Sequence, residues 1–270
     1  MKNILVTGAC GGMGKATCKI LIENGYNVFG IDVTECNNPN LHYVKTDITN
    51  LESIENAFSI ISEKVDKLDA IVHFAGIYNL NSLLEISEEE FIRIFNINMF
   101  GMYRINKVFA PLLKQGSRIV ITSSELGPLD PLPFTGLYGI TKTTIEKYAY
   151  SLRMEVQLLG IDVVILRPGA VDTGLLPAST RAIDKFCENT KLYKYNSNKF
   201  RQITNMVESK NIPPEKIAQL TLKILKAKKP KYVYNINRNK LLRLLNFLPQ
   251  KMQTKIIKKI LLPPKNKNKK

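Results

Sequence analysis

A glycine-rich turn near the start of the chain constrains the fold more than any other feature of the sequence. The turn reads Thr7-Gly8-Ala9-Cys10-Gly11-Gly12-Met13-Gly14. It follows an apolar run at residues 3–7 and leads into residues 13–24, whose apolar positions recur at helical spacing. This order predicts the first strand and helix of a parallel α/β unit. The glycines allow the backbone to approach a pyrophosphate, which the free N–H groups of the helix N-terminus can bind.

Strands and helices are expected to alternate along most of the chain. The further strands are predicted at residues 28–31, 70–74, 118–123, 161–166 and 231–235, and the helices at residues 51–64, 88–114, 137–159 and 213–227. Nearly continuous apolar strands indicate a parallel sheet that is buried on both faces. Residues 174–212 show no clear periodicity, and so long a stretch predicts a functional or mobile segment, here a substrate lid.

An acidic residue at the end of the second strand bears on the choice of cofactor. Asp32 lies 18 residues after Gly14, where a carboxylate can accept hydrogen bonds from the hydroxyls of an adenosine ribose. Its charge would repel the 2′-phosphate of NADP, and neither Cys10 nor Val33 is basic. We therefore expect NAD in preference to NADP, although NADP stays open. The residues of the turn expected to bind the cofactor are Gly8, Cys10, Gly11, Gly12, Met13 and Gly14.

A tyrosine and a lysine share one face of a predicted helix. Tyr138 and Lys142 are four residues apart, so their side chains lie on the same side. Tyrosine has an unperturbed pKa near ~10, which a neighbouring ammonium or a bound nicotinamide cation would lower. The pair therefore suits acid–base work near neutral pH. Ser124 closes a predicted strand nearby and could hold a substrate oxygen against the tyrosine.

The order of these motifs resembles the short-chain dehydrogenase/reductase family, in its short, non-extended branch with hydroxysteroid and retinol dehydrogenase-like members. The resemblance covers about residues 3–235, and its motifs are the glycine turn, Asp47-Ile48, His73-Phe74-Ala75-Gly76, Asn98-Met99-Phe100-Gly101, Ser123-Ser124, Tyr138-x-x-x-Lys142 and Arg167-Pro168-Gly169. It implies a single-domain Rossmann fold at residues 1–235, with a doubly wound parallel sheet of about seven strands. It also implies an NAD(P)(H)-dependent oxidoreductase that moves hydride between nicotinamide and a secondary alcohol or ketone.

The resemblance gives four residues a catalytic role. Tyr138 would be the general acid/base, and Lys142 would lower its pKa and bind the nicotinamide ribose. Ser124, rather than Ser123, would orient the substrate. Asn98 would complete a proton relay through a bound water.

The resemblance also extends the cofactor site beyond the glycine turn and Asp32. Asp47 would contact the adenine, and the backbone after Phe74 would pass the adenosine ribose. The residues implied on the adenosine side are Asp47, Ile48, Phe74, Ala75 and Gly76. Those implied around the nicotinamide are Tyr138, Lys142, Pro168, Gly169, Val171 and Thr173.

Three features depart from the family pattern. Phe74 stands where the family has an asparagine that steadies adjacent strands, so local detail is expected to differ. Glu125 places a charge near the substrate pocket, and we expect it to face solvent rather than meet a substrate hydroxyl. The glycine turn also satisfies the spacing of the extended branch, so an epimerase or dehydratase with tightly bound NAD is an alternative. A membrane-associated NAD-binding protein without turnover is another.

The positive charge of the chain is concentrated at its C-terminal end. The net charge is +16, and residues 221–270 contain 16 basic residues and no acidic one, whereas residues 1–220 contain 23 of each. Within residues 236–270, apolar residues recur at helical spacing among lysines, which is typical of an amphipathic tail at an anionic membrane surface. A helix packed on the catalytic domain is the alternative. Phe247 is the only aromatic residue after Tyr234, which argues against nucleic acid as a partner.

The composition argues against several other kinds of site and of protein. Four cysteines and two histidines without ligand spacing argue against a metal site and give no sign of a disulfide framework. No apolar run reaches ~18 residues, so no transmembrane helix is expected. The start of the chain lacks the shape of a signal peptide, which predicts a cytoplasmic protein, with peripheral membrane contact through the tail.

The expected partners are a small apolar substrate and further copies of the chain. Residues 174–212 include leucine, phenylalanine and tyrosine side chains, which favours an apolar alcohol or ketone. The long helices predicted at 88–114 and 137–159 would form the interface of a homodimer or homotetramer, as the resemblance implies.

Overall fold

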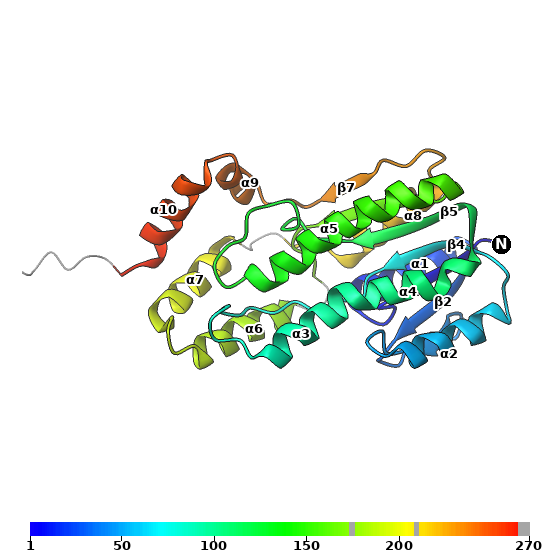
Figure 1. Cartoon of the computed structure of the whole chain (residues 1–270), viewed down its shortest axis with the longest axis horizontal. Helices are drawn as coiled ribbons and strands as arrows, with labels where there is room; N and C mark the ends of the chain where they lie inside the picture. Colours follow the sequence, from blue (N-terminus) through cyan, green and yellow to red (C-terminus); the bar gives the residue numbers. More distant parts are fainter. Residues whose placement is uncertain (173–175, 208–210, 264–270) are drawn as a thin grey trace, which may run out of the picture.

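A parallel sheet of seven strands forms the centre of the protein (Figure 1). The computed structural model describes residues 1–172, 176–207 and 211–263. The strand order is β3-β2-β1-β4-β5-β6-β7, and every neighbouring pair is parallel. The strands are β1 (Asn3–Thr7), β2 (Asn27–Asp32), β3 (His42–Lys45), β4 (Leu68–His73), β5 (Leu113–Thr122), β6 (Asp162–Pro168) and β7 (Val233–Ile236). The predicted Rossmann-like fold is confirmed.

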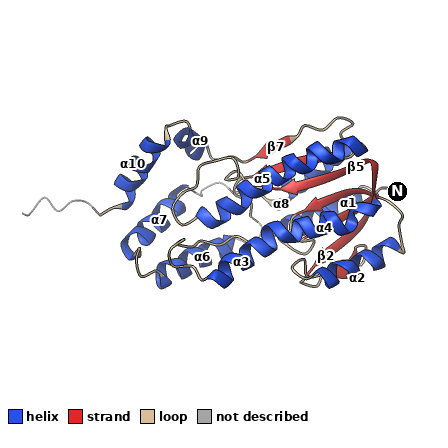
Figure 2. Ribbon diagram, in the orientation of Figure 1, coloured by secondary structure: helices blue, strands red, loops and turns tan. Residues whose placement is uncertain are grey.

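Helices cover both faces of the sheet because successive side chains of each strand point to opposite sides (Figure 2). In β1, Ile4 and Val6 belong to the core under α1 (Gly12–Glu23) and α8 (Pro214–Lys226). Leu5 belongs to the opposite core, under α2 (Leu51–Ser62) and α4 (Gly101–Phe109). The second core continues under α5 (Gly136–Val156), which packs on β5 and β6. Burial on both faces explains why the strands are continuously apolar.

The long helix predicted at residues 88–114 is interrupted. It consists of α3 (Glu88–Phe95), the π-helical turn η1 (Asn96–Phe100), α4 and the 3-10 turn η2 (Ala110–Leu112). A π-helical turn inserts an extra residue into a helix and is frequent at functional sites. The helical path ends two residues earlier than predicted, and β5 begins at Leu113 rather than at residue 118.

Three elements were not predicted from periodicity. β3 is a short edge strand with half-exposed side chains, so it lacks an apolar run. Residues 174–212 contain α6 (Leu176–Asn189) and α7 (Lys194–Val207), which pack mainly on each other. Their shared apolar cluster includes Phe186, Phe200 and Leu261, away from the sheet. This cluster is assembled from distant parts of the chain, which weakens any local signal.

The C-terminal segment folds as two helices against the domain that contains the sheet. α9 (Lys240–Asn246) and α10 (Gln250–Leu261) lie at the end of the molecule remote from α2, with α10 beside α7 (Figure 1). Asn246 Oδ1 accepts a hydrogen bond from the Asp130 N–H, at 2.7 Å, and Gln253 Nε2 donates to Asp130 Oδ2, at 2.8 Å. Within the described residues, no helix is long and apolar enough to cross a membrane.

Candidate active site

The predicted site residues gather where the strands β1, β4, β5 and β6 end. The chain runs outward from β1 to β2 and β3, then returns to β4 on the other side of β1. Ligands of such sheets bind at the carboxyl ends of the strands, beside this change of direction. The glycine turn follows β1, and Ser124 follows β5.

The glycine turn has no room for a side chain at two of its positions, and the helix that it leads into begins without a side-chain cap. Gly8 has φ of +67°, and a Cβ at this position would lie 2.7 Å from the Ala75 nitrogen. A Cβ on Gly14 would lie 2.0 Å from the Gly8 oxygen. No side chain caps the N-terminus of α1, and its first turn carries no acidic residue. The backbone here therefore fits the pyrophosphate of a dinucleotide.

Asp32 is held in place by two backbone N–H groups. The Cys10 N–H donates to Asp32 Oδ2 and the Thr34 N–H donates to Oδ1, both at 3.0 Å. A carboxylate oxygen can accept a second hydrogen bond, so each oxygen retains capacity for a ribose hydroxyl. The residues present thus fit the adenosine half of a nicotinamide dinucleotide.

A disulfide joins Cys10 and Cys36, although the cysteine spacing gives no sign of a disulfide framework. The two Cα atoms lie 5.3 Å apart, and the bridge joins the glycine turn to the loop after β2. The two cysteines are 26 residues apart in sequence, and the N–H of Cys10 donates to Asp32. The other two cysteines, Cys18 and Cys187, are buried and free.

The remaining residues expected on the adenosine side follow the strands β3 and β4. The Asp47 carboxylate accepts hydrogen bonds from the N–H and hydroxyl of Thr49, at 2.8 and 2.7 Å. Ile48 is buried against Gly101, where a Cβ would lie 2.6 Å from the Ile48 Cδ1. Phe74 packs against the core under α1 and α8, which accounts for an apolar residue at this position.

Asn98 is buried in the π-helical turn η1 and ties two segments together. Its Oδ1 accepts from the Ile77 N–H at 2.8 Å. Its Nδ2 donates to the Ile77 carbonyl at 3.0 Å and to Thr141 Oγ1 at 3.2 Å. A Cβ on Gly76 would lie 3.2 Å from Asn98 Oδ1, so glycine is favoured there. Asn98 thus fixes the loop after β4 against the helix that carries Lys142.

The structure brings Ser124, Tyr138 and Lys142 together. The Ser124 side chain is hydrogen-bonded to the Tyr138 phenol. Lys142 Nζ lies 5.5 Å from the centroid of the Tyr138 ring and donates to the Thr122 carbonyl at 3.1 Å. Ser123 instead donates to the Lys142 carbonyl, at 3.5 Å, and is buried behind the site. Of the two serines, Ser124 is therefore the one beside the phenol.

Burial has the largest effect on the pKa values of Tyr138 and Lys142. Loss of solvent raises the pKa of Tyr138 to about 12, and the Ser124 hydrogen bond opposes the rise. Loss of solvent lowers the pKa of Lys142 to about 8, and the negative charge of Glu146 opposes the fall. The expectation that neighbouring protein groups lower the pKa of Tyr138 is therefore wrong. Desolvation penalises the phenolate more than those groups stabilise it. A bound nicotinamide cation would favour the phenolate.

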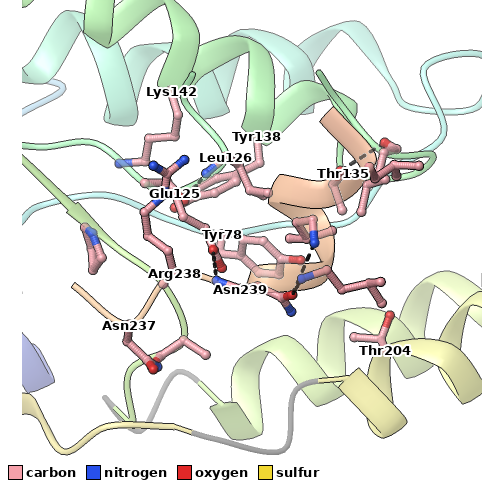
Figure 3. Close-up of a pocket in the computed structure, with 18 of the residues that line it drawn as sticks. Tyr78, Glu125, Leu126, Thr135, Tyr138, Lys142, Thr204, Asn237, Arg238 and Asn239 are labelled. Carbon is pink, nitrogen blue, oxygen red and sulfur yellow. Dashed lines mark hydrogen bonds between the residues drawn. The ribbon is translucent and has the colours of Figure 1, made fainter. Parts of the chain in front are cut away.

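Glu125 lies inside the site, which corrects the expectation that it faces solvent. The side chain is half-buried, and Oε2 accepts a hydrogen bond from the Asn239 N–H at 2.6 Å. Burial raises the pKa of Glu125, and Arg238, which extends toward it from the end of β7, opposes the rise (Figure 3). Asn239 in turn caps α9 by accepting from the N–H groups of Leu241 and Leu242. Glu125 therefore anchors the first C-terminal helix beside Ser124.

The loop after β6 completes the expected nicotinamide side. Pro168 ends β6, and the Gly169 N–H donates to the Ile236 carbonyl at 2.9 Å. Val171 pairs with Ile212 in a parallel bridge. Pro168, Gly169 and Val171 all line the main cavity. Thr173 lies outside the described residues.

A cavity of about 910 Å³ opens from these residues toward the C-terminal helices. Ser124, Tyr138 and Lys142 line its inner end together with Tyr78, whose ring meets that of Tyr138 edge-on at 4.8 Å (Figure 3). The outer wall is apolar and comes from α9, α10 and the turn between them. Its residues are Leu241, Leu242, Leu244, Leu245, Leu248, Ile256, Ile257, Ile260 and Leu261.

These wall residues were not predicted to belong to the site. The sequence feature that could have indicated them is the recurrence of leucine and isoleucine along residues 236–262. This recurrence predicts an apolar helix face but does not identify the surface that the face packs against. Tyr78 and Thr141 were also missed, since neither belongs to a recognisable spacing. In the described residues, no group of three or more acidic, histidine or cysteine side chains is placed to hold a metal ion.

Comparison with known proteins agrees with this geometry. A sequence model described as short chain dehydrogenase matches residues 2–184. The chain belongs to the short-chain dehydrogenase family. It is therefore an NAD(P)-dependent oxidoreductase of the kind that acts on alcohols and ketones.

Individual relatives fall within the same family. The 3-ketodihydrosphingosine reductase of Bacteroides thetaiotaomicron is 28% identical over 232 residues, which cover 85% of each chain. Estradiol 17-beta-dehydrogenase 2 of Mus musculus is 31% identical over 188 residues, 64% of this chain and 49% of that protein. A crystal structure of a short chain dehydrogenase family protein from Francisella tularensis superposes with a TM-score of 0.73 at 27% identity, covering 87% of this chain and 97% of that one.

Proposed function

We propose that the protein transfers hydride between NAD(H) and a secondary alcohol or ketone that carries a large apolar, lipid-like group. The observation that carries this proposal is the position of Ser124, Tyr138 and Lys142 at the inner end of an apolar cavity. A cavity of about 910 Å³ is at the upper end of the range for small-molecule sites, ~300–1,000 Å³. Redox chemistry is favoured over the epimerase and dehydratase alternative because the matched family model is that of the dehydrogenases.

The protein's own residues perform positioning and proton transfer. When bound, the nicotinamide supplies or accepts the hydride. Tyr138 gives a proton to the substrate oxygen in reduction and removes it in oxidation, while Ser124 holds that oxygen beside the phenol. Lys142 favours the phenolate by its charge and binds the nicotinamide ribose. A binding protein without turnover has no need of this arrangement, which argues against the non-catalytic alternative.

The role of Asn98 is to position the helix that carries Lys142. Both hydrogens of its Nδ2 are donated within the protein, to Ile77 and Thr141. Its side chain therefore fixes the lysine-bearing helix, and a water of the proton relay would be held by its main chain.

The cofactor is proposed to be NAD rather than NADP. Asp32 is oriented by two N–H donors, as an acceptor of two ribose hydroxyls would be. The adenine would lie against Asp47 and Ile48. Neither Val33 nor Thr34, which follow Asp32 in sequence, is basic, and neither is Cys10, whose N–H donates to it, so none of the three would neutralise a 2′-phosphate.

The substrate class follows from the wall of the cavity. Nine leucine and isoleucine side chains from residues 241–261 line it, so an aliphatic or steroid-like body can be enclosed. Relatives named for 3-ketodihydrosphingosine, estradiol and 3beta-hydroxysteroid support sphingoid and steroid alcohols or ketones as the first compounds to test, with retinoids as a further apolar class.

The protein is proposed to act in the cytoplasm as a homodimer or homotetramer. Aromatic and apolar side chains are exposed on α4 and α5, among them Tyr103 at 41%, Tyr150 at 54% and Met154 at 50%. A second copy packed on these helices would cover this apolar surface. Analytical ultracentrifugation at micromolar concentration tests the assembly, and a monomer there would contradict it.

The decisive experiment follows NADH absorbance during turnover. The enzyme is given NAD with a panel of steroid, retinoid, sphingoid and simple secondary alcohols, and NADH with the matching ketones. Turnover with one class, abolished in Tyr138→Phe, is the expected result. No turnover with any compound, while NAD binding is confirmed separately, would contradict the proposal.

A further inference from the structure

The two C-terminal helices have an outer surface that their role as a cavity wall does not explain. We propose that the outer surface of α9 and α10 docks on an anionic lipid bilayer, so that the cavity opens toward the membrane and takes a lipid substrate from it. The docking is a property of the surface itself. The delivery of substrate rests on the proposed function.

The helix α10 has two opposite faces. Gln253, Ile256, Ile257, Ile260 and Leu261 recur at intervals of three and four residues, and the isoleucines and Leu261 line the cavity. The lysines fall on the opposite face of the helix and are exposed. They are Lys251, Lys255, Lys258 and Lys259.

Exposed apolar side chains lie among these charges. Phe247 is 79% exposed and Met252 is 48% exposed, and neither lines the cavity. At this exposure most of the large apolar ring of Phe247 lies in water. Interfacial segments combine such apolar side chains with lysine and arginine.

The charge of this end of the chain selects an anionic partner. Residues 221–270 contain no acidic residue, while residues 1–220 are balanced. A basic residue near an anionic membrane strengthens binding by about fivefold. Four outer lysines together with Arg243, which is also exposed, would therefore give strong attraction at low salt. Nucleic acid would be attracted by the same charge, but a single exposed phenylalanine offers little for bases to stack on.

The outer surface adjoins the cavity. Leu241, Leu244 and Ile260 line the cavity and are also 58%, 64% and 46% exposed, so they form its rim. Arg243 and Phe247 lie next to this rim in α9 and its C-cap. A bilayer in contact with Phe247 would therefore meet the opening, and an apolar molecule could pass to Tyr138 without crossing water.

The test is sedimentation of the full chain with vesicles, in the absence of substrate and cofactor. We expect binding to vesicles of phosphatidylglycerol and phosphatidylcholine, weak binding to phosphatidylcholine alone, and release at high salt. Replacement of three outer lysines (Lys255→Glu, Lys258→Glu and Lys259→Glu) should weaken binding more than about 100-fold. Phe247→Glu with Met252→Glu should weaken it at least about tenfold.

A control triple variant changes the net charge equally at a distance from α10. Lys19→Glu, Lys64→Glu and Lys223→Glu lie on α1, after α2 and on α8, and all three are exposed. This variant should retain most of the vesicle binding. Equal loss in both triple variants would overturn the proposal, since net charge alone would then explain the attraction. Absence of wild-type binding to anionic vesicles, or tighter binding to a DNA duplex, would overturn it as well.

Turnover measurements distinguish a failure of the membrane proposal from a failure of the proposed function. Lysine variants should lose turnover of a long-chain ketone dissolved in vesicles and keep turnover of a short, water-soluble ketone. Vesicle binding without turnover of any ketone would contradict the oxidoreductase proposal alone. Turnover of the vesicle-bound ketone that is unchanged in the lysine variants would contradict delivery from the membrane.

Discussion

Lys142 Nζ lies 5.5 Å from the centre of the Tyr138 ring, one helical turn away, and both groups are enclosed at the inner end of the cavity. Enclosure raises the pKa of the phenol to about 12 and lowers that of the ammonium to about 8. The pKa values of the two groups therefore lie farther apart than those of free tyrosine and lysine, and in the reverse order, with the phenol above the ammonium. A cationic ligand beside them would shift the balance toward phenolate.

Removal of the phenol should abolish most of the turnover. In Tyr138→Phe the substrate oxygen has no proton donor, so kcat/KM should fall by ~10²–10⁴. Steady-state NADH absorbance measures the loss, and the circular dichroism spectrum should stay unchanged. Tyr150→Phe, on the exposed face of the same helix, is the matched control. Similar losses in both variants would point to damage of α5 rather than to loss of an acid.

Removal of the buried ammonium should stabilise the protein while it lowers activity. The folded-state pKa of Lys142 is lowered from 10.5 to about 8, so burial of its charge costs about 3 kcal/mol at pH 7. The folded state binds fewer protons than the unfolded state between these pH values, so the penalty is full below pH 8 and disappears as pH rises toward 10.5.

Urea unfolding of Lys142→Met at pH 7 and pH 10 measures this effect. The variant should be more stable than the wild type at pH 7, by up to about 3 kcal/mol, with a smaller difference at pH 10. Lys147→Met changes an exposed lysine of the same helix and should show no pH-dependent gain. A Lys142→Met variant that is less stable at both pH values would show that the ammonium is stabilised by its surroundings.

Asp32 should determine the preference for NADH over NADPH. Loss of hydrogen bonds from a carboxylate to two ribose hydroxyls in Asp32→Ser should raise the Kd of NADH about 10–100-fold. The Kd of NADPH should fall, because the repulsion of its phosphate is removed. NADH fluorescence titration gives both constants, and Asp66→Asn, at an exposed site, serves as control. Tighter binding of NADPH than NADH to the wild type would contradict the NAD proposal.

The Cys10–Cys36 disulfide should stabilise the adenosine side of the site. A bridge that closes a loop of 26 residues contributes about 3 kcal/mol to the free energy of unfolding. Reductant should therefore lower the stability in urea and weaken NADH binding a fewfold, since Cys10 also orients Asp32. Cys36→Ser should resemble the reduced wild type and show no response to reductant. A continued response of this variant would assign the effect to other cysteines.

The π-helical turn at Asn96–Phe100 is a feature that the sequence pattern could not predict. Apolar spacing predicts one helix over residues 88–114, and the spacing alone cannot show one inserted residue. The insertion is stabilised by hydrogen bonds of Asn98 to Ile77 and Thr141, which are far away in sequence. The edge strand β3 was missed because its side chains are half-exposed and form no apolar run. The helices α6 and α7 were missed because their buried residues belong to a cluster that also includes Leu80 and Leu261 from distant parts of the chain.

Local periodicity and the conformational freedom of glycine were sufficient to predict the parallel α/β fold, the glycine turn and the shared helix face of Tyr138 and Lys142. The other features of the site depend on contacts between distant parts of the chain. In the folded chain Cys10 forms a disulfide with Cys36, and Glu125 lies inside the site, where it accepts a hydrogen bond at the N-terminus of α9. The apolar residues of the C-terminal segment line the cavity. Burial also reverses the expected pKa shift of Tyr138. Desolvation and packing depend on what surrounds a residue in space, and no local pattern specifies those neighbours.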